Sequence, residues 1–166
     1  MPPFPPDGAA VFIDANIVYY HFVRVPELSE WSSQLLERFA QRRLSVFAST
    51  HVIAEAIHKI MAAEAAQRFS IPRPAIVTHL RHHPERLAEL TMFRTAASEL
   101  EVIAMPLLAT DARMVVEAAD LSLSHGLLTN DALTVALMRR NGLADLASND
   151  DDFNRVPALT VWKPQP

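Results

Sequence analysis

The sequence predicts an α/β fold in which helices flank a parallel β-sheet. Its 166 residues, half of them hydrophobic and a fifth charged, suit one domain with a sizeable core. Short apolar runs typical of buried strands alternate with amphipathic segments of helical period. This alternation is typical of parallel strands that are connected through helices.

The first half of the chain contains two expected strands, residues 9–13 and 44–48, which are short, apolar and rich in β-branched or aromatic side chains. Between them, apolar residues at helical spacing predict an amphipathic helix that begins at Pro26 and ends at Arg43. A further helix is expected from the N-cap candidates at residues 49–50 through Ala66.

In the middle of the chain, a polar, proline-punctuated connection at residues 70–74 leads to an expected helix over residues 84–98. A strand is expected near residues 101–105. Gly126 and Gly142 each follow a helical pattern and precede an apolar residue, which is the signature of the position after a helix. Each glycine is therefore expected to end a helix and to start a strand.

Composition excludes several classes of protein. The chain has no cysteine, which excludes disulfides, thiolate zinc sites and thiol nucleophiles, and we expect a cytoplasmic location. Residues 1–8 form a Pro-rich extension without the features of a secretory signal, and no window predicts a membrane span. We expect this extension and residues 164–166 to be solvated ends. The net charge of −4 disfavours a general nucleic-acid coat protein.

Acidic residues follow the expected strands. Asp14 directly follows the first, and Glu55 lies one helical turn after the second, in a helix with mostly apolar neighbours. Asp131 and Asp150 end two copies of one pattern, an apolar run followed by a hydroxyl residue, Asn and Asp. Because the carboxyl ends of parallel strands meet at one edge of a sheet, we expect these four carboxylates to converge.

Such a cluster needs protons or metal ions. Two carboxylates about 5 Å apart repel by roughly 3 kcal/mol at an effective dielectric constant near 20. With only oxygen ligands present, Mg²⁺ or Mn²⁺ is the natural occupant. Ions of this kind activate water and stabilise the charge that develops during phosphodiester cleavage.

The chain resembles the PIN-domain nucleases and, among them, the VapC-like ribonuclease toxins of type II toxin–antitoxin systems. The matching segments are residues 12–18, Glu55, residues 130–136 and residues 147–153. The resemblance implies a three-layer α/β/α sandwich with a central parallel sheet, formed by residues 9–163 as a single domain. It also implies an Mg²⁺- or Mn²⁺-dependent endoribonuclease with an RNA substrate, a cognate antitoxin and a homodimeric state.

The resemblance assigns catalysis and metal coordination to four residues and adds Asp152 as a further metal ligand. The four are Asp14, Glu55, Asp131 and Asp150. The acidic run 150–152 leaves the fourth ligand open between its first and last residue, and the repeated pattern favours Asp150. The family has no counterpart of the Pro-rich extension, to which no role is assigned.

Each candidate also has a structural interpretation. Asp14 could form a turn with its own backbone, and Asp131 and Asp150 could cap helices or turns. Asn16 is expected to orient the site or to cap a helix. Thr129 and Ser148 are expected either to hydrogen-bond a ligand or carboxylate, or to act as N-caps.

Other functions remain as alternatives. A receiver domain would have paired acids after the first strand, whereas Asp14 is followed by Ala15. A phosphatase of the haloacid dehalogenase type would need an aspartate where Asn16 stands. His79, His82 and His83 have a helix-compatible spacing that could bind a metal, but residues 82–84 are interpreted instead as a solvated helix start. No catalytic histidine is assigned. A nuclease of RNA processing and a non-catalytic PIN-like binding module remain the serious alternatives.

Overall fold

The structure is a computed structural model, and it describes residues 4–164. Five parallel strands form one sheet in the order β3-β2-β1-β4-β5. The strands are β1 (Ala10–Ile13), β2 (Ser45–Ser49), β3 (Leu107–Leu108), β4 (Asp145–Ala147) and β5 (Thr160–Trp162). The predicted α/β fold with a central parallel sheet is therefore confirmed.

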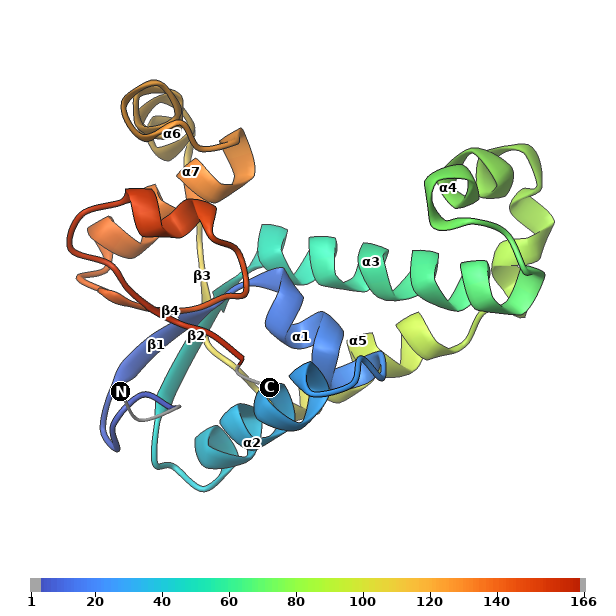
Figure 1. Ribbon diagram of the computed structural model, residues 1–166, viewed down its shortest axis with the longest axis horizontal. Coiled ribbons are helices and arrows are strands. Elements are labelled where there is room, and N and C mark those ends of the chain that lie inside the picture. The colour runs from blue at the N-terminus through green and yellow to red at the C-terminus, as the bar shows by residue number, and fades with distance from the viewer. Residues whose placement is uncertain (1–3, 165–166) are drawn as a thin grey trace.

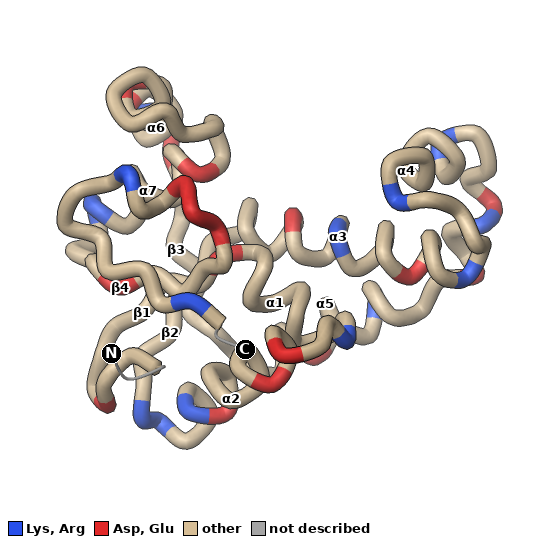
Figure 2. The backbone as a smooth tube through the Cα atoms, viewed as in Figure 1, with Lys and Arg blue, Asp and Glu red and all other residues tan. Residues whose placement is uncertain are grey.

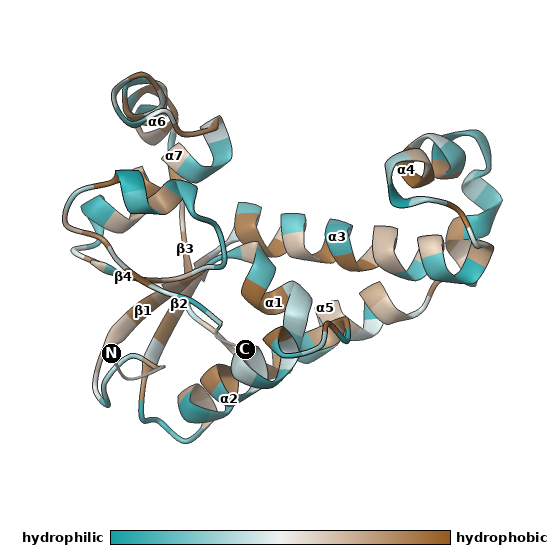
Figure 3. Cartoon of the chain, in the orientation of Figure 1, coloured by the Kyte–Doolittle hydropathy of each residue, from teal (hydrophilic) through white to brown (hydrophobic). Residues whose placement is uncertain are grey.

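Helices cover both faces of the sheet (Figure 1). One layer contains α1 (Ala15–Phe22), α2 (Leu28–Ala40), α3 (Thr50–Phe69) and α5 (Met92–Ile103), and the other contains α6 (Ala112–His125) and α7 (Thr129–Arg140). Val11, Phe12 and Ile13 in β1 are fully buried. Because alternate side chains of a strand point to opposite faces, this burial requires cover on both faces, and Figure 3 shows β1 and β2 as apolar strands.

The second half of α3 extends away from the sheet (Figure 1). At its far end lie α4 (Arg73–His82) and the short 3₁₀ helix η1 (Pro84–Glu89), and α5 leads back to the sheet. We call this projection the helical arm. Its small apolar core is distinct from the main core and is formed by Ala65, Ile76, Leu80 and Leu90.

Three elements expected between residues 70 and 105 differ in the structure. The helix expected at residues 84–98 is divided between η1 and α5, and α4 begins within the connection expected at residues 70–74 and continues to His82, where no helix was predicted. Pro74 does not exclude α4, because a helix tolerates proline in its first turn. The strand expected at residues 101–105 is wrong: α5 continues to Ile103, left-handed Ala104 ends it, and β3 follows.

Both glycines end helices, but a strand follows only one of them. Gly126 and Gly142 both adopt left-handed φ angles of +66° and end α6 and α7, as predicted. Gly142 is followed by β4, but no strand follows Gly126. Leu127 and Leu128 form only a short link between α6 and α7, which pack against each other, and Leu127 is buried in this position without strand pairing.

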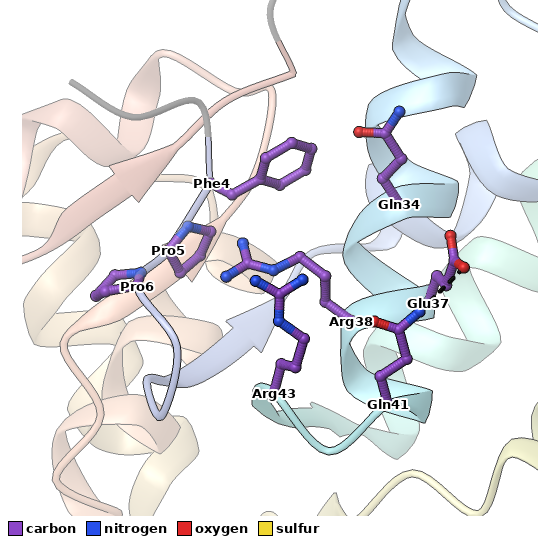
Figure 4. A pocket seen from close by; sticks show the side chains of 8 residues that line it. All are labelled: Phe4, Pro5, Pro6, Gln34, Glu37, Arg38, Gln41 and Arg43. Carbon is purple, nitrogen blue, oxygen red and sulfur yellow. Dashed lines mark hydrogen bonds between the residues drawn. The ribbon is translucent and has the colours of Figure 1, made fainter.

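The N-terminal extension is anchored to the domain through Phe4 and the buried Pro5, so the expected solvated end is wrong for these two residues, whereas residues 6–8 are exposed as expected. Phe4 stacks on Trp31 of α2 with ring centroids 5.1 Å apart. Asp7 pairs with Arg38 at 2.5 Å and with Arg43 at 3.0 Å. Figure 4 shows both guanidinium groups in the groove of about 510 Å³ between this segment and α2.

At the other end of the chain, Pro164 is buried, which contradicts the expected solvated tail, and residues 165–166 lie outside the described part. None of the helices within residues 4–164 is both long enough and apolar enough to cross a lipid bilayer.

Candidate active site

Asp14 lies at the carboxyl end of the central strand, where it is the N-cap of α1. Its Oδ1 accepts a hydrogen bond from the backbone N–H of Ala15 at 2.6 Å. Its Oδ2 accepts hydrogen bonds from the side chains of Asn16 at 3.0 Å and Ser148 at 2.8 Å. Burial raises the pKa of Asp14 above its ordinary value, although the bond from Ser148 and the nearby charge of Lys59 oppose this effect.

The loop after β4 contributes the next two acids and is connected to Asp14 by hydrogen bonds. Ser148 is fully buried, and its Oγ accepts a bond from the backbone N–H of Asp150 at 3.0 Å. Oδ1 of Asp150 accepts a bond from the backbone N–H of Asp152 at 2.8 Å. Asp152 also pairs with Arg155 at 2.8 Å. The serine therefore fixes the neighbouring strand ends β1 and β4 relative to each other.

Glu55 reaches the site from α3 and is balanced by a lysine one turn along the helix. Its Oε1 lies 2.7 Å from Lys59 Nζ, and about a third of its side chain is exposed. Lys59 Nζ also donates a hydrogen bond to Asn16 Oδ1 at 3.0 Å. Asn16 thus connects Asp14 to Lys59, which is the orienting arrangement expected of it.

Asp131 lies in the first turn of α7. Its pKa is raised to about 6, mainly by burial and then by the negative charges of Asp14, Asp150, Glu55 and Asp152, in that order. The five acidic side chains therefore lie close enough to repel one another. In Figure 2, acidic positions gather between α7, the loop after β4 and the start of α3.

Asp131 reaches this cluster from a different element than the sequence predicted. The expectation of four acids after four strands is wrong here, because Asp131 belongs to a helix that follows no strand. Thr129 is the exposed first residue of α7, whose N-cap is Leu128, so Thr129 does not act as an N-cap. The two copies of the hydroxyl-Asn-Asp pattern thus have different structures: one begins a helix and the other lies in a loop.

Three polar residues near the acids were not singled out from the sequence. Lys59 lies four residues after Glu55, a spacing that identifies helical ion pairs and could have revealed it. His51 lies between Ser49 Oγ at 2.9 Å and Thr134 Oγ1 at 3.3 Å, and burial lowers its pKa. Tyr20 accepts a hydrogen bond from Asn149 at 3.2 Å. The contacts of His51 with Thr134 and of Asn149 with Tyr20 join residues that are far apart in the sequence, so no local pattern indicates them.

The carboxylate oxygens of the candidate acids are ligands of the kind that hard divalent cations prefer. Within residues 4–164, no group of three or more His, Asp or Glu side chains is arranged so that it could hold a metal ion. The ligand atoms that these acids offer are nevertheless all oxygens. The negative charges of four of them act on Asp131, and a cation would neutralise this excess of negative charge. An ion that keeps several of its own waters, as Mg²⁺ does, needs only a few protein ligands.

The sequence as a whole matches the family model described as PIN domain over residues 11–159, and the chain belongs to this family. Comparison with curated proteins gives no match. The match to the family model covers all five candidate acids.

Three solved structures share the fold. The toxin VapC20 of Mycobacterium tuberculosis, described as cleaving the sarcin–ricin loop, is 15% identical, with a TM-score of 0.60 over 87% of this chain and 92% of its own. VapBC2 of Rickettsia felis, solved with a promoter DNA fragment, is 17% identical, with a TM-score of 0.55 over 93% and 98%. PAE2754 of Pyrobaculum aerophilum is 13% identical, with a TM-score of 0.51 over 93% and 90%.

Proposed function

We propose that this protein is a metal-dependent endoribonuclease, a hydrolase of RNA phosphodiester bonds. The observation that carries the proposal is the convergence of five carboxylates: Asp14 and the loop after β4 are joined through Ser148, and the charges of four acids act on the half-buried Asp131. Four residues would hold Mg²⁺ or Mn²⁺ and serve catalysis: Asp14, Glu55, Asp131 and Asp150. Asp152 would be a further ligand, although its pairing with Arg155 favours Asp150 as the main fourth one.

A bound divalent ion would supply an activated water and stabilise the charge that develops on the phosphate. The protein's own residues prepare the site for it. Ser148 and Asn16 fix the Asp14 carboxylate in one orientation by donating to the same oxygen, Oδ2. Lys59, held by Glu55 and Asn16, places a positive charge at the rim of the site, where an RNA phosphate would approach.

We further propose that the chain is the toxin component of a VapBC-type pair, with a cognate antitoxin, a homodimeric state and a cytoplasmic location. The support is the family, together with two structural neighbours that are named as a VapC toxin and a VapBC complex. Growth arrest on expression of the protein, relieved by co-expression of a neighbouring gene, would support the toxin role. An unaffected culture would favour an RNA-processing nuclease.

Cleavage of structured RNA by the purified protein tests the enzymatic proposal. Activity is expected with Mg²⁺ or Mn²⁺, and it should disappear in EDTA and in Asp14→Asn. Asp120→Asn is the matched control, because Asp120 is an exposed acid on α6 whose side chain makes no hydrogen bond or ion pair within residues 4–164. If the folded, metal-loaded wild-type protein cleaves none of the RNAs offered, a non-catalytic PIN-like binding module becomes the better interpretation.

A further inference from the structure

A groove of about 510 Å³ extends from the candidate active site along α1 and α3 to the start of α4. We call it the α1–α3 groove. Asn16, the residue that donates to Asp14, lines it, and so does Lys59, the partner of Glu55. The residues of α3 that line the groove continue from His58 to Ala63. At 1.5 Å per residue, α3 carries the groove roughly 12 Å beyond Glu55.

Arg73, the first residue of α4, supplies a positive charge at the end of the groove remote from the acids. Its Nη2 donates a hydrogen bond to the hydroxyl of Tyr19 at 2.7 Å, and its guanidinium lies 5.8 Å from the centre of the Tyr19 ring. Among residues 4–164, no carboxylate forms an ion pair with Arg73. Most of its five N–H donors therefore remain free for an anion, and the guanidinium geometry suits a phosphate.

The stretch between the two charges offers an aromatic and apolar surface. Tyr20 packs edge-on against Tyr19, with ring centroids 5.6 Å apart. The hydroxyl of Tyr20 accepts a bond from Asn149, the neighbour of Asp150, so the ring is also tied to the active-site loop. The apolar lining consists of Val25, Leu28, Ala62 and Ala63. A fixed aromatic ring beside an apolar floor is a surface on which an unpaired base can stack.

We propose that the α1–α3 groove binds one unpaired RNA nucleotide next to the scissile bond, with Arg73 on its phosphate and Tyr20 against its base. This inference rests on the proposed function, because it takes the acids as the place of cleavage. Three features favour single-stranded RNA as the occupant: an arginine without a carboxylate partner, a fixed tyrosine, and an uninterrupted lining that leads to Asn16. A duplex would present its bases already paired and stacked.

Binding in EDTA tests the inference without relying on catalysis. Fluorescence anisotropy with a short, labelled, single-stranded oligoribonucleotide gives the Kd at several salt concentrations. Arg73→Gln should weaken binding about tenfold and reduce the magnitude of the slope of log K against log salt by about 0.7, the value for one phosphate contact on a single strand. Arg81→Gln is the matched control, because it removes the same charge from an exposed position on α4.

The base contact has its own pair of variants. Tyr20→Leu should weaken binding by about tenfold, as expected for the loss of one stacked base, without changing the salt slope. Tyr20→Phe keeps the ring and loses only the bond from Asn149, so binding should be largely retained. Circular dichroism and thermal unfolding identify any variant that fails to fold, in which case Arg73→Gln and Tyr20→Phe remain informative.

The outcomes separate this inference from the proposed function. If the wild-type protein cleaves RNA while Arg73→Gln and Tyr20→Leu bind and cleave as it does, the groove inference is wrong and the nuclease stands. If both variants lose binding but the wild-type protein cleaves nothing, the groove is supported and the proposed function fails. Variants that cleave normally but escape inhibition by an antitoxin would assign the groove to a protein partner and overturn the inference.

Discussion

Asp131→Asn should make the metal-free protein more stable at neutral pH, because it removes a charge that burial disfavours and that four other acids repel. The rise of the Asp131 pKa from 3.8 to about 6 corresponds to at most about 3 kcal/mol, at 1.36 kcal/mol per pKa unit. Partial solvent exposure screens this energy. The asparagine also loses about 0.5 kcal/mol of attraction to the N-terminus of α7. A net gain of about 1–2 kcal/mol remains, and it should raise the Tm by about 4 °C.

The sign of this effect depends on pH. A carboxyl group whose pKa is raised in the folded state binds its proton more tightly there, so its ionisation destabilises the fold. The cost is absent well below the unfolded pKa of 3.8, where the group is protonated in both states. It grows as the pH rises through that value and is complete once the pH has passed the folded pKa of about 6. The Tm difference between Asp131→Asn and the wild type should therefore be fully present near pH 7.5 and largely lost near pH 4.

Thermal unfolding followed by circular dichroism in EDTA measures this difference, with Asp120→Asn as the control for loss of an exposed acid. Adding Mn²⁺ should reverse the order, because the wild type gains about 2.7 kcal/mol at a concentration one hundred times its Kd and the variant gains less. A Tm for Asp131→Asn that equals or falls below that of the wild type near pH 7.5 in EDTA would refute the reasoning. So would an equal gain at both pH values.

Three further outcomes are expected. Asp14→Asn should lower RNA cleavage by about 100-fold or more while the far-ultraviolet circular dichroism is unchanged, and activity close to that of the wild type would remove Asp14 from the site. Ser148→Ala should cost about 1–3 kcal/mol in chemical denaturation, because the buried Asp14 carboxylate and the Asp150 N–H lose their shared partner, and it should weaken Mn²⁺ binding at least tenfold in calorimetry. Gly142→Ala should cost about 1 kcal/mol through its φ of +66° alone, since no atom lies within 4 Å of the added Cβ, and an unchanged midpoint of denaturation would contradict this.

The sequence predicted those parts of the fold that depend on local patterns. β1 and β2 have the short apolar runs of buried strands, and the positions of Gly126 and Gly142 correctly predicted two helix ends, the second of them followed by β4. The strand expected at residues 101–105 failed because helix and strand are not separable by periodicity in a short apolar run. There, the chain continues α5, which packs on α3.

The candidate site was predictable to the extent that topology places residues together. Asp14 and Asp150 follow neighbouring parallel strands, so their proximity follows from the strand order. Asp131 was expected for the wrong reason, because its position depends on how α7 packs on the sheet rather than on any strand. The contacts of Arg73 with Tyr19 and of Asn149 with Tyr20 join residues 54 and 129 positions apart, and no spacing in the sequence records them.

The electrostatics of two of the acids oppose folding. Asp14 receives three hydrogen bonds, yet burial still raises its pKa, and the pKa of Asp131 is raised by burial and by four neighbouring charges. Neutral side chains at these positions would serve the fold better, because Lys59 is one positive charge beside five acids and the like charges that it leaves unbalanced oppose folding. Ser148, Asn16 and Lys59 hold these charges in place rather than dispersing them. Under the proposed function, a bound divalent cation would offset these electrostatic costs, and the wild-type protein should then gain more stability from Mn²⁺ than the Asp131→Asn variant.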